Sequence, residues 1–128
     1  MGFDVHGIYS IEPYETRYLD AIDGDGTIKV LMYDSYGDDT NIPKWVVPQL
    51  KIDGKEVFPA WSIEGYHNRF KDSKEGIFFG AWDDVAFWYT LIFVLDLRFR
   101  KSFQIGMKNF HPTEVYSGIT FYVYELLL

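Results

Sequence analysis

The sequence has no cysteine among its 128 residues. This absence excludes a disulfide scaffold, a thiol nucleophile, an iron–sulfur cluster and any zinc site with cysteine ligands. No Asn-x-Ser/Thr acceptor occurs, and the opening residues lack the basic start and apolar stretch of a signal peptide. The longest apolar run, 85–95, is interrupted only by Thr90 and is too short for a membrane-spanning helix, which takes about 20 residues. We therefore expect a soluble cytoplasmic protein that has no membrane partner.

Basic residues are also scarce: 12 Lys and Arg stand against 19 Asp and Glu, and the formal net charge is −7. A protein that binds nucleic acid by direct phosphate contact needs the opposite balance. The excess acid is local, because residues 1–40 contain nine acidic and two basic side chains while the remainder is neutral overall. Such a one-sided field steers encounters with basic partners. The predicted binding surface comprises Asp20, Asp23, Asp25, Asp34, Tyr36, Asp38 and Asp39.

Motifs for catalysis and for phosphate binding are absent too. No Gly-x-Ser-x-Gly elbow, Gly-x-Gly-x-x-Gly loop or Walker lysine occurs. The segment 23–28 resembles part of a calcium loop, but Ala21 and Met32 occupy positions where that loop needs carboxylates. The three histidines would make a metal site only if remote segments converge: His6, His67 and His111. We predict no catalytic residue and no cofactor, and a metal-dependent enzyme is the least favoured alternative.

The length and the pattern of apolar residues predict one β-rich domain, 1–128. Alternating residues predict strands at 5–11, 16–22, 27–33 and 119–124, and a strand pattern over 95–107 that is bent or turned near Lys101 and Ser102. In the strand at 27–33 we expect Ile28, Val30 and Met32 on one side. Residues 34–39 have the composition of a loop.

The clearest local signal is Asp53-Gly54, which lies between two strand-like runs. Asp-Gly suits a two-residue type I′ turn, because both central residues of that turn need a positive φ. The predicted register pairs Ile52 with Lys55 and Lys51 with Glu56. We therefore expect a β-hairpin over residues 50–57.

Residues 62–71 predict one short helix, because Ser62 can cap its start and apolar side chains fall on one stripe. Residues 84–95 are ambiguous, since periodicity does not separate a buried strand from a buried helix. Their aromatic and β-branched side chains favour a strand. The predicted fold is therefore mainly β, an antiparallel sandwich or open barrel with one short helix. The alternative is an α+β fold with a central helix at 84–95.

Aromatic side chains are abundant, with 4 Trp, 10 Tyr and 11 Phe. Most aromatics of this kind fill a core, but Tyr and Trp also form binding faces and stack on sugars or bases. The only basic cluster lies at 98–101 and could pair with a carboxylate or phosphate. A pocket for a sugar or nucleotide would use Trp82, Trp88, Arg98 and Arg100.

These observations favour a small acidic binding protein that acts by protein–protein interaction. Inhibitors and immunity proteins have this general size and charge. The expected partner presents a basic surface. Sheet edges and the apolar end at 126–128 also suggest a homodimer. The alternative is the small-ligand domain described above.

Overall fold

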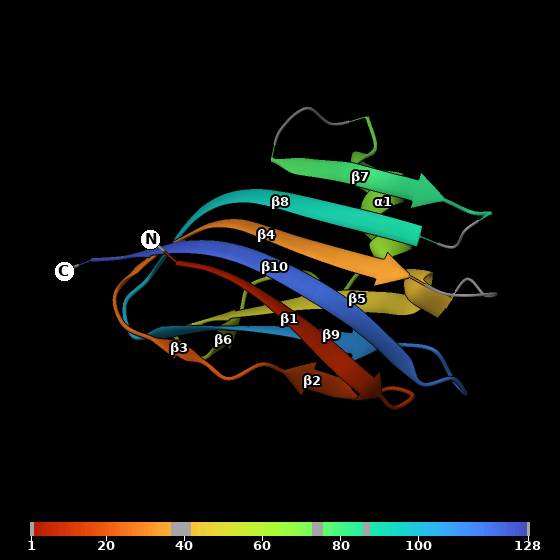
Figure 1. The fold of residues 1–128 in the computed structure, drawn as a ribbon, viewed down its shortest axis with the longest axis horizontal. Helices are drawn as coiled ribbons and strands as arrows, with labels where there is room; N and C mark the ends of the chain where they lie inside the picture. The colour runs from red at the N-terminus through yellow and green to blue at the C-terminus, as the bar shows by residue number, and fades with distance from the viewer. Residues whose placement is uncertain (1, 37–41, 73–75, 86–87, 128) are drawn as a thin grey trace.

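Two antiparallel β-sheets pack around one hydrophobic core in the computed structural model, which describes residues 2–36, 42–72, 76–85 and 88–127 (Figure 1). The front sheet contains five strands in the order β1-β10-β4-β8-β7. Their bounds are β1 (Gly2–Ile11), β10 (Tyr116–Leu126), β4 (Gly26–Tyr36), β8 (Trp88–Phe99) and β7 (Ile77–Asp83).

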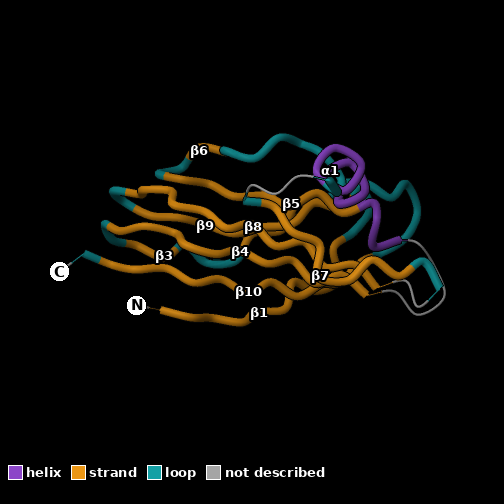
Figure 2. Tube along the Cα trace, turned by 90° about the horizontal axis from the view of Figure 1, so that it is seen from above, coloured by secondary structure: helices purple, strands orange, loops and turns teal. Residues whose placement is uncertain are grey.

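The back sheet follows the order β2-β9-β5-β6, and β3 pairs with β9. Its strands are β2 (Thr16–Tyr18), β9 (Ser102–Asn109), β5 (Val46–Ile52), β6 (Lys55–Glu56) and β3 (Ile22–Asp23). A short 3-10 helix, η1 (Ile42–Trp45), precedes β5, and α1 (Ile63–Phe70) follows β6. Figure 2 shows α1 on the side of the back sheet, away from β1 and β10. The prediction of a β-sandwich with one short helix is confirmed.

The hairpin at 50–57 forms as its sequence predicts. Lys51 pairs with Glu56 and Ile52 pairs with Lys55. Asp53 and Gly54 both adopt positive φ, 53° and 83°, as a type I′ turn requires. The Asp53 carboxylate also accepts backbone N–H bonds from residues 100, 101 and 102, where the chain crosses from β8 to β9. These bonds lower the pKa of Asp53 and join the hairpin tip to the crossing between the two sheets.

Helix α1 is confirmed within one residue of its predicted ends, and the Ser62 side chain accepts the N–H of Gly65 as its cap. The alternative of a central helix at 84–95 is wrong, because Trp88 to Leu95 belong to strand β8. This segment is flanked on both sides by β4 and β7, so two ladders satisfy its backbone groups. Its β-branched and aromatic side chains suit that position.

Strand β4 corrects two expectations. Its register shifts between Ile28 and Val30, so Ile28, Leu31 and Tyr33 are fully buried whereas Val30 and Met32 lie on the opposite side. The prediction that Ile28 lies on the same side as Val30 and Met32 is therefore wrong, because it assumed strict alternation through this irregularity. The loop expected at 34–39 is also wrong for its first three residues, which continue β4 through pairing with β8. Residues 37–39 lie outside the described part.

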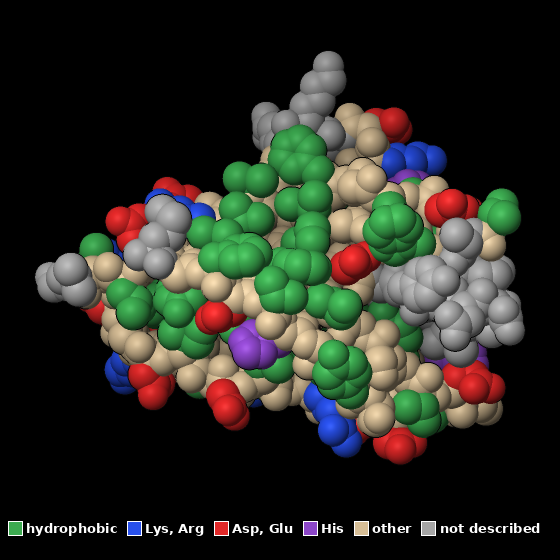
Figure 3. Space-filling view, viewed as in Figure 1, with side chains coloured by type: hydrophobic (Ala, Val, Ile, Leu, Met, Phe, Trp, Pro, Cys, Tyr) green, Lys and Arg blue, Asp and Glu red, His purple; other side chains and the backbone are tan. Residues whose placement is uncertain are grey.

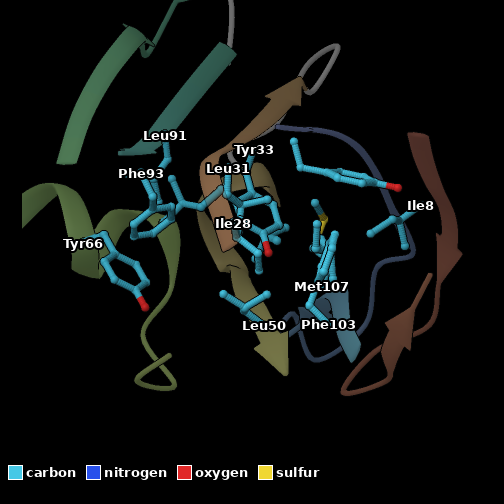
Figure 4. Packing of buried hydrophobic residues seen from close by; sticks show 14 of the residues in the cluster. Ile8, Ile28, Leu31, Tyr33, Leu50, Tyr66, Leu91, Phe93, Phe103 and Met107 are labelled. Carbon is cyan, nitrogen blue, oxygen red and sulfur yellow. The ribbon is translucent and has the colours of Figure 1, made fainter. Parts of the chain in front are cut away.

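The core lies between the two sheets and is closed on one side by α1 (Figure 4). The ring of Phe93 stacks on Phe58 at 4.6 Å and meets Tyr66 of α1 edge-on at 5.4 Å. The buried Tyr33 hydroxyl donates toward two backbone carbonyls of the back sheet, those of Gln49 at 2.8 Å and Gly106 at 3.1 Å. Aromatic contacts and this hydroxyl therefore join the front sheet to the opposite layer.

Candidate interaction surface

The front sheet carries apolar side chains on its outer face as well as on its inner face. Strand pairing aligns the outer ones in two rows that cross the sheet. The first row is Phe78, Ile92, Met32, Phe121 and Val5, and the second is Val94, Val30, Val123 and Phe3. We call these nine residues the apolar rows.

The apolar rows are open to solvent in this structure. Phe3 is 64% exposed, Val94 52%, Val5 47% and Phe78 45%, and the other five members are half-buried. Figure 3 looks onto this face and shows hydrophobic side chains gathered over the middle of the sheet. We place their combined exposed surface at about 600 Å², at the upper end of what a monomeric protein carries as one patch. Exposed apolar patches of this size often serve as interaction sites.

The two-layer architecture explains why this face is apolar. Residues 91–95 are apolar at every position, yet a strand in a sandwich turns only alternate side chains toward the core. Leu91 and Phe93 are buried, and Ile92 and Val94 therefore point outward. Sequence reasoning missed this surface because it took the run as buried on all sides. The sequence signal that could have revealed it is that residues 91–95 contain more apolar side chains than one face of a sheet can bury.

Charged residues border the apolar rows at one end. Lys29 pairs with Asp96 at 2.9 Å, and the Arg98 guanidinium pairs with Asp25 at 2.6 Å. Both pairs are exposed, so each adds little to stability. They nevertheless neutralise four charges at this border.

The other end of the face contains a shallow hollow with a mainly apolar lining. Its lining includes Tyr9, Asp34 and Ile119, and its volume is about 220 Å³. The Asp34 carboxylate accepts hydrogen bonds from the Trp88 indole N–H and, at 3.1 Å, from the Thr90 hydroxyl. Two residues predicted separately as site residues, Asp34 and Trp88, thus lie together on the outer face.

The predicted acidic surface is not continuous in the structure. Asp25 precedes β4 and Asp34 lies near its far end, about 30 Å away at about 3.3 Å per residue. Asp20 and Asp23 are exposed, Asp20 before β3 and Asp23 within it, and β3 pairs with β9 of the back sheet. The backbone of Tyr36 pairs with Trp88, and Asp38 and Asp39 lie outside the described residues.

The residues predicted for a sugar or nucleotide site do not form one pocket. Trp82 stacks on His67, whereas Trp88 binds Asp34 on the outer face. Arg98 is paired with Asp25. Arg100 lies in the turn between β8 and β9, where its backbone N–H donates to Asp53. Trp82 lies on β7, and Trp88 and Arg98 lie at opposite ends of β8, so the structure does not bring the four predicted side chains together.

The histidines are also apart. The ring of His6 on β1 stacks on Tyr122, and that of His67 on α1 stacks on Trp82. His111 follows β9 and accepts a backbone N–H bond from Glu114 at 3.0 Å. Among the described residues, no group of three or more His, Asp or Glu is placed to hold a metal ion. The convergence that a three-histidine metal site requires does not occur.

His67 belongs to a cluster between α1 and β7. Its ring lies parallel to Trp82 with centroids 3.7 Å apart. Lys44 lies near the Trp82 ring and pairs with Asp84 at 2.6 Å, and this bond lowers the pKa of Asp84. Desolvation lowers the pKa of His67, as do the charges of Lys71 and Lys44, against weaker opposition from Asp84 and Glu64. The fold therefore favours the neutral imidazole.

This arrangement predicts a pH dependence of stability. The pKa of His67 is lower in the folded than in the unfolded state, so the unfolded state binds more protons and stability falls as pH decreases below about 6.5. We expect His67→Phe, which keeps a ring against Trp82, to reduce the slope of unfolding free energy between pH 7 and 5. Urea denaturation at several pH values measures this slope. An unchanged slope contradicts the role assigned to His67.

An aromatic cavity lies on the other side of α1. Its volume is about 330 Å³, and its walls include Phe58, Trp61, Tyr66, Phe70 and Phe93. The Tyr66 hydroxyl is turned to the Pro59 carbonyl at 3.1 Å, and burial raises its pKa above the ordinary range. The Arg69 guanidinium covers the Trp61 ring at 4.0 Å. The cavity therefore offers a ligand mainly carbon surface.

Comparisons with known proteins identify no relative by sequence: no family model and no curated protein matches this chain. A solved structure with a similar chain path is a serine protease of Aeromonas sobria, with a TM-score of 0.40 and 6% sequence identity. The match covers 95% of this chain and 26% of the protease chain. The described part of this chain contains no helix with both the length and the apolar character to cross a membrane.

Proposed function

We propose that this chain is a protein-binding module whose contact surface is the outer face of the front sheet. The observation that carries the proposal is the pair of apolar rows, of which the first crosses all five strands and the second crosses four, and both stay open to solvent. An apolar centre with charged residues at its border is the usual anatomy of a protein interface. In this function the protein acts as inhibitors and immunity proteins do, by occupying a surface of another molecule.

The acidic residues have a different role in this proposal. Asp25 pairs with Arg98 and Asp34 accepts a hydrogen bond from Thr90, so these two carboxylates stabilise the conformation of the face itself. Asp20 and Asp23 remain exposed, and the net charge of −7 would speed the approach of a partner with a basic surface. Charge would thus control the association rate, and the apolar rows would supply most of the affinity.

Site-specific photo-crosslinking tests the contact surface without knowledge of the partner. A photoreactive amino acid is placed at Val94, in the apolar rows, and at Lys55, in the exposed hairpin of the back sheet. We expect discrete protein adducts from position 94 in the producing cells and none from position 55. Absence of adducts at 94, or equal adducts at both positions, contradicts the proposal.

A second candidate function is the binding of a small apolar molecule, favoured by the aromatic cavity beside α1. A volume of about 330 Å³ lies within the range of small-molecule sites. The polar groups of Tyr66 and Pro59 bind each other, so an uncharged aromatic ligand would leave no buried group unpaired. This site replaces the predicted one at Trp82, Trp88, Arg98 and Arg100.

Naphthalene is a suitable probe for the aromatic cavity. We expect it to raise the thermal midpoint by several degrees once its concentration is far above the dissociation constant. Leu95→Trp, which fills the cavity from its wall, should abolish that shift while the unliganded midpoint stays close to that of the wild type. A midpoint unaffected by naphthalene rejects this second function.

A further inference from the structure

We infer that the apolar rows bind a second copy of this chain, so that two front sheets pack face to face in a two-fold symmetric dimer. This inference rests on the contact surface of the proposed function, and it names a second copy of the chain, in place of a basic protein, as the occupant of that surface. Residues that carry it belong to every strand of the front sheet. The area of the face, its symmetry and the position of its charges favour a second copy as the occupant.

The area suffices for a stable dimer. The apolar rows expose about 600 Å² per copy, and the adjoining rings of Tyr9 and Trp88, 64% and 45% exposed, bring the contact to about 800 Å². A standard protein–protein interface buries about 800 Å² on each partner. The apolar character of the rows is that of homodimer interfaces, which are less polar than those of transient complexes.

The face is also arranged for contact with itself. β4 is the central strand, with two strands on each side, and contributes Val30 and Met32 to the rows. A large ring lies at either edge, Phe3 on β1 and Phe78 on β7. A two-fold axis along β4 places the β1 edge of one copy over the β7 edge of the other. Every strand of the face is then covered, at the usual sheet separation of about 10 Å.

Charge favours a second copy over a basic partner at this face. The nine residues of the apolar rows carry no charge. The border charges Lys29, Asp96, Arg98 and Asp25 pair within one chain. The exposed acids Asp20 and Asp23 lie by β3, outside the rows. An apolar partner surface is therefore the best match, and an identical face provides one.

The salt dependence of binding distinguishes a second copy of the chain from a basic protein partner. Two copies of net charge −7 repel each other, so added salt screens the repulsion and strengthens the dimer. A complex with a basic partner responds in the opposite way, because salt weakens its attraction. Sedimentation equilibrium of the purified chain should give a dimer with a dissociation constant on the order of micromolar. This constant should fall as the NaCl concentration rises from about 0.05 to 0.5 M.

The chain offers a matched pair of variants for locating the interface. Val94→Lys adds a charge within the apolar rows, and Val57→Lys adds the same charge at an exposed valine beside β6. The exposed fractions of the two valines are similar, 52% and 44%. We expect Val94→Lys to raise the dimer dissociation constant by at least about 100-fold, because each dimer would bury two unpaired ammonium groups. Val57→Lys should leave it within about twofold of the wild type.

Crosslinking adds a measurement that does not require a variant with weakened dimerisation. The chain has no cysteine, so Met32→Cys on the central strand provides a single thiol near the two-fold axis. A short bismaleimide should link two copies through this thiol and should not link copies that carry Lys55→Cys. Circular dichroism of each variant checks that the β-rich fold is retained.

The outcomes distinguish the inference from the proposed function. A wild-type chain that sediments as a monomer at all salt concentrations overturns the dimer. If position 94 still gives adducts in cells, the proposed function stands with a different partner. If Val57→Lys dissociates the dimer and Val94→Lys does not, the apolar rows are not the dimer interface and the inference fails, whereas the proposed function is decided by the adducts at position 94.

Discussion

Replacing Phe93 with alanine is expected to lower the free energy of unfolding by about 3–5 kcal/mol, which corresponds to a fall of about 10–20 °C in the thermal midpoint. Phe93 is 2% exposed, and its ring contacts Phe58, Tyr66 and Tyr33. These contacts connect the front sheet with α1 and with the segment that follows β6. Truncation removes them and joins the space left behind to the aromatic cavity. Denaturant unfolding measures the loss.

The neighbouring residue in the same strand provides the control. Val94 is 52% exposed on the outer face of one chain, so Val94→Ala removes little surface buried within the chain and should cost the monomer less than about 1 kcal/mol. Phe93→Leu should cost less than Phe93→Ala, because it leaves a smaller cavity. Equal losses for Phe93→Ala and Val94→Ala would mean that β8 does not present these two residues to opposite faces.

Replacing Asn109 with alanine is expected to cost about 2–4 kcal/mol although this side chain is polar. Asn109 is fully buried at the end of β9. Its amide nitrogen donates to the carbonyls of Ile11, at 3.0 Å, and Glu114, and its oxygen accepts the N–H of His111 at 2.8 Å. One side chain therefore ties the end of β1 to the loop between β9 and β10. Alanine leaves backbone groups without partners in a buried site.

The variant Asn109→Asp tests this interpretation because it preserves the shape of the side chain. In Asn109→Asp, a carboxylate oxygen replaces the amide nitrogen that donates to the two carbonyls, and an acceptor then faces two acceptors. The loss of unfolding free energy near pH 7 should therefore equal or exceed that of Asn109→Ala. Protonation restores a donor, and the difference between the two variants should narrow toward pH 4. If both variants unfold at the wild-type urea concentration, the three hydrogen bonds are not important for stability.

Local signals determined several elements from the sequence alone. The hairpin at 50–57 depends on two adjacent residues, Asp53 and Gly54, whose backbone preferences act within the turn itself. Helix α1 begins at a capping serine, which makes its contact three residues away. A bend or turn was predicted near Lys101 and Ser102 because the alternation on both sides was regular, and the structure has a turn there between β8 and β9. Each of these signals acts over a few residues, so no distant part of the chain is needed to interpret it.

The candidate site could not be predicted in the same way. Its rows are composed of residues from five strands, and strand pairing over separations of more than 100 positions aligns Val5 and Phe121. The register shift near Val30 moved Val30 and Met32 from the expected inner side to the outer face. Charge was visible in the sequence, but the pairing of Asp25 with Arg98 links residues 73 positions apart.

By itself, the sequence determined the β-rich class, the hairpin, the short helix and the excess of acid in the first third of the chain. These properties arise from composition and from interactions between near neighbours. Only the tertiary structure decided which side of each strand faces the core. A strand that is apolar on both sides, such as residues 91–95, has the same pattern whether both sides are buried or only one is. The two-layer packing buried Leu91 and Phe93 and left Val94 at the surface, and this created the apolar rows.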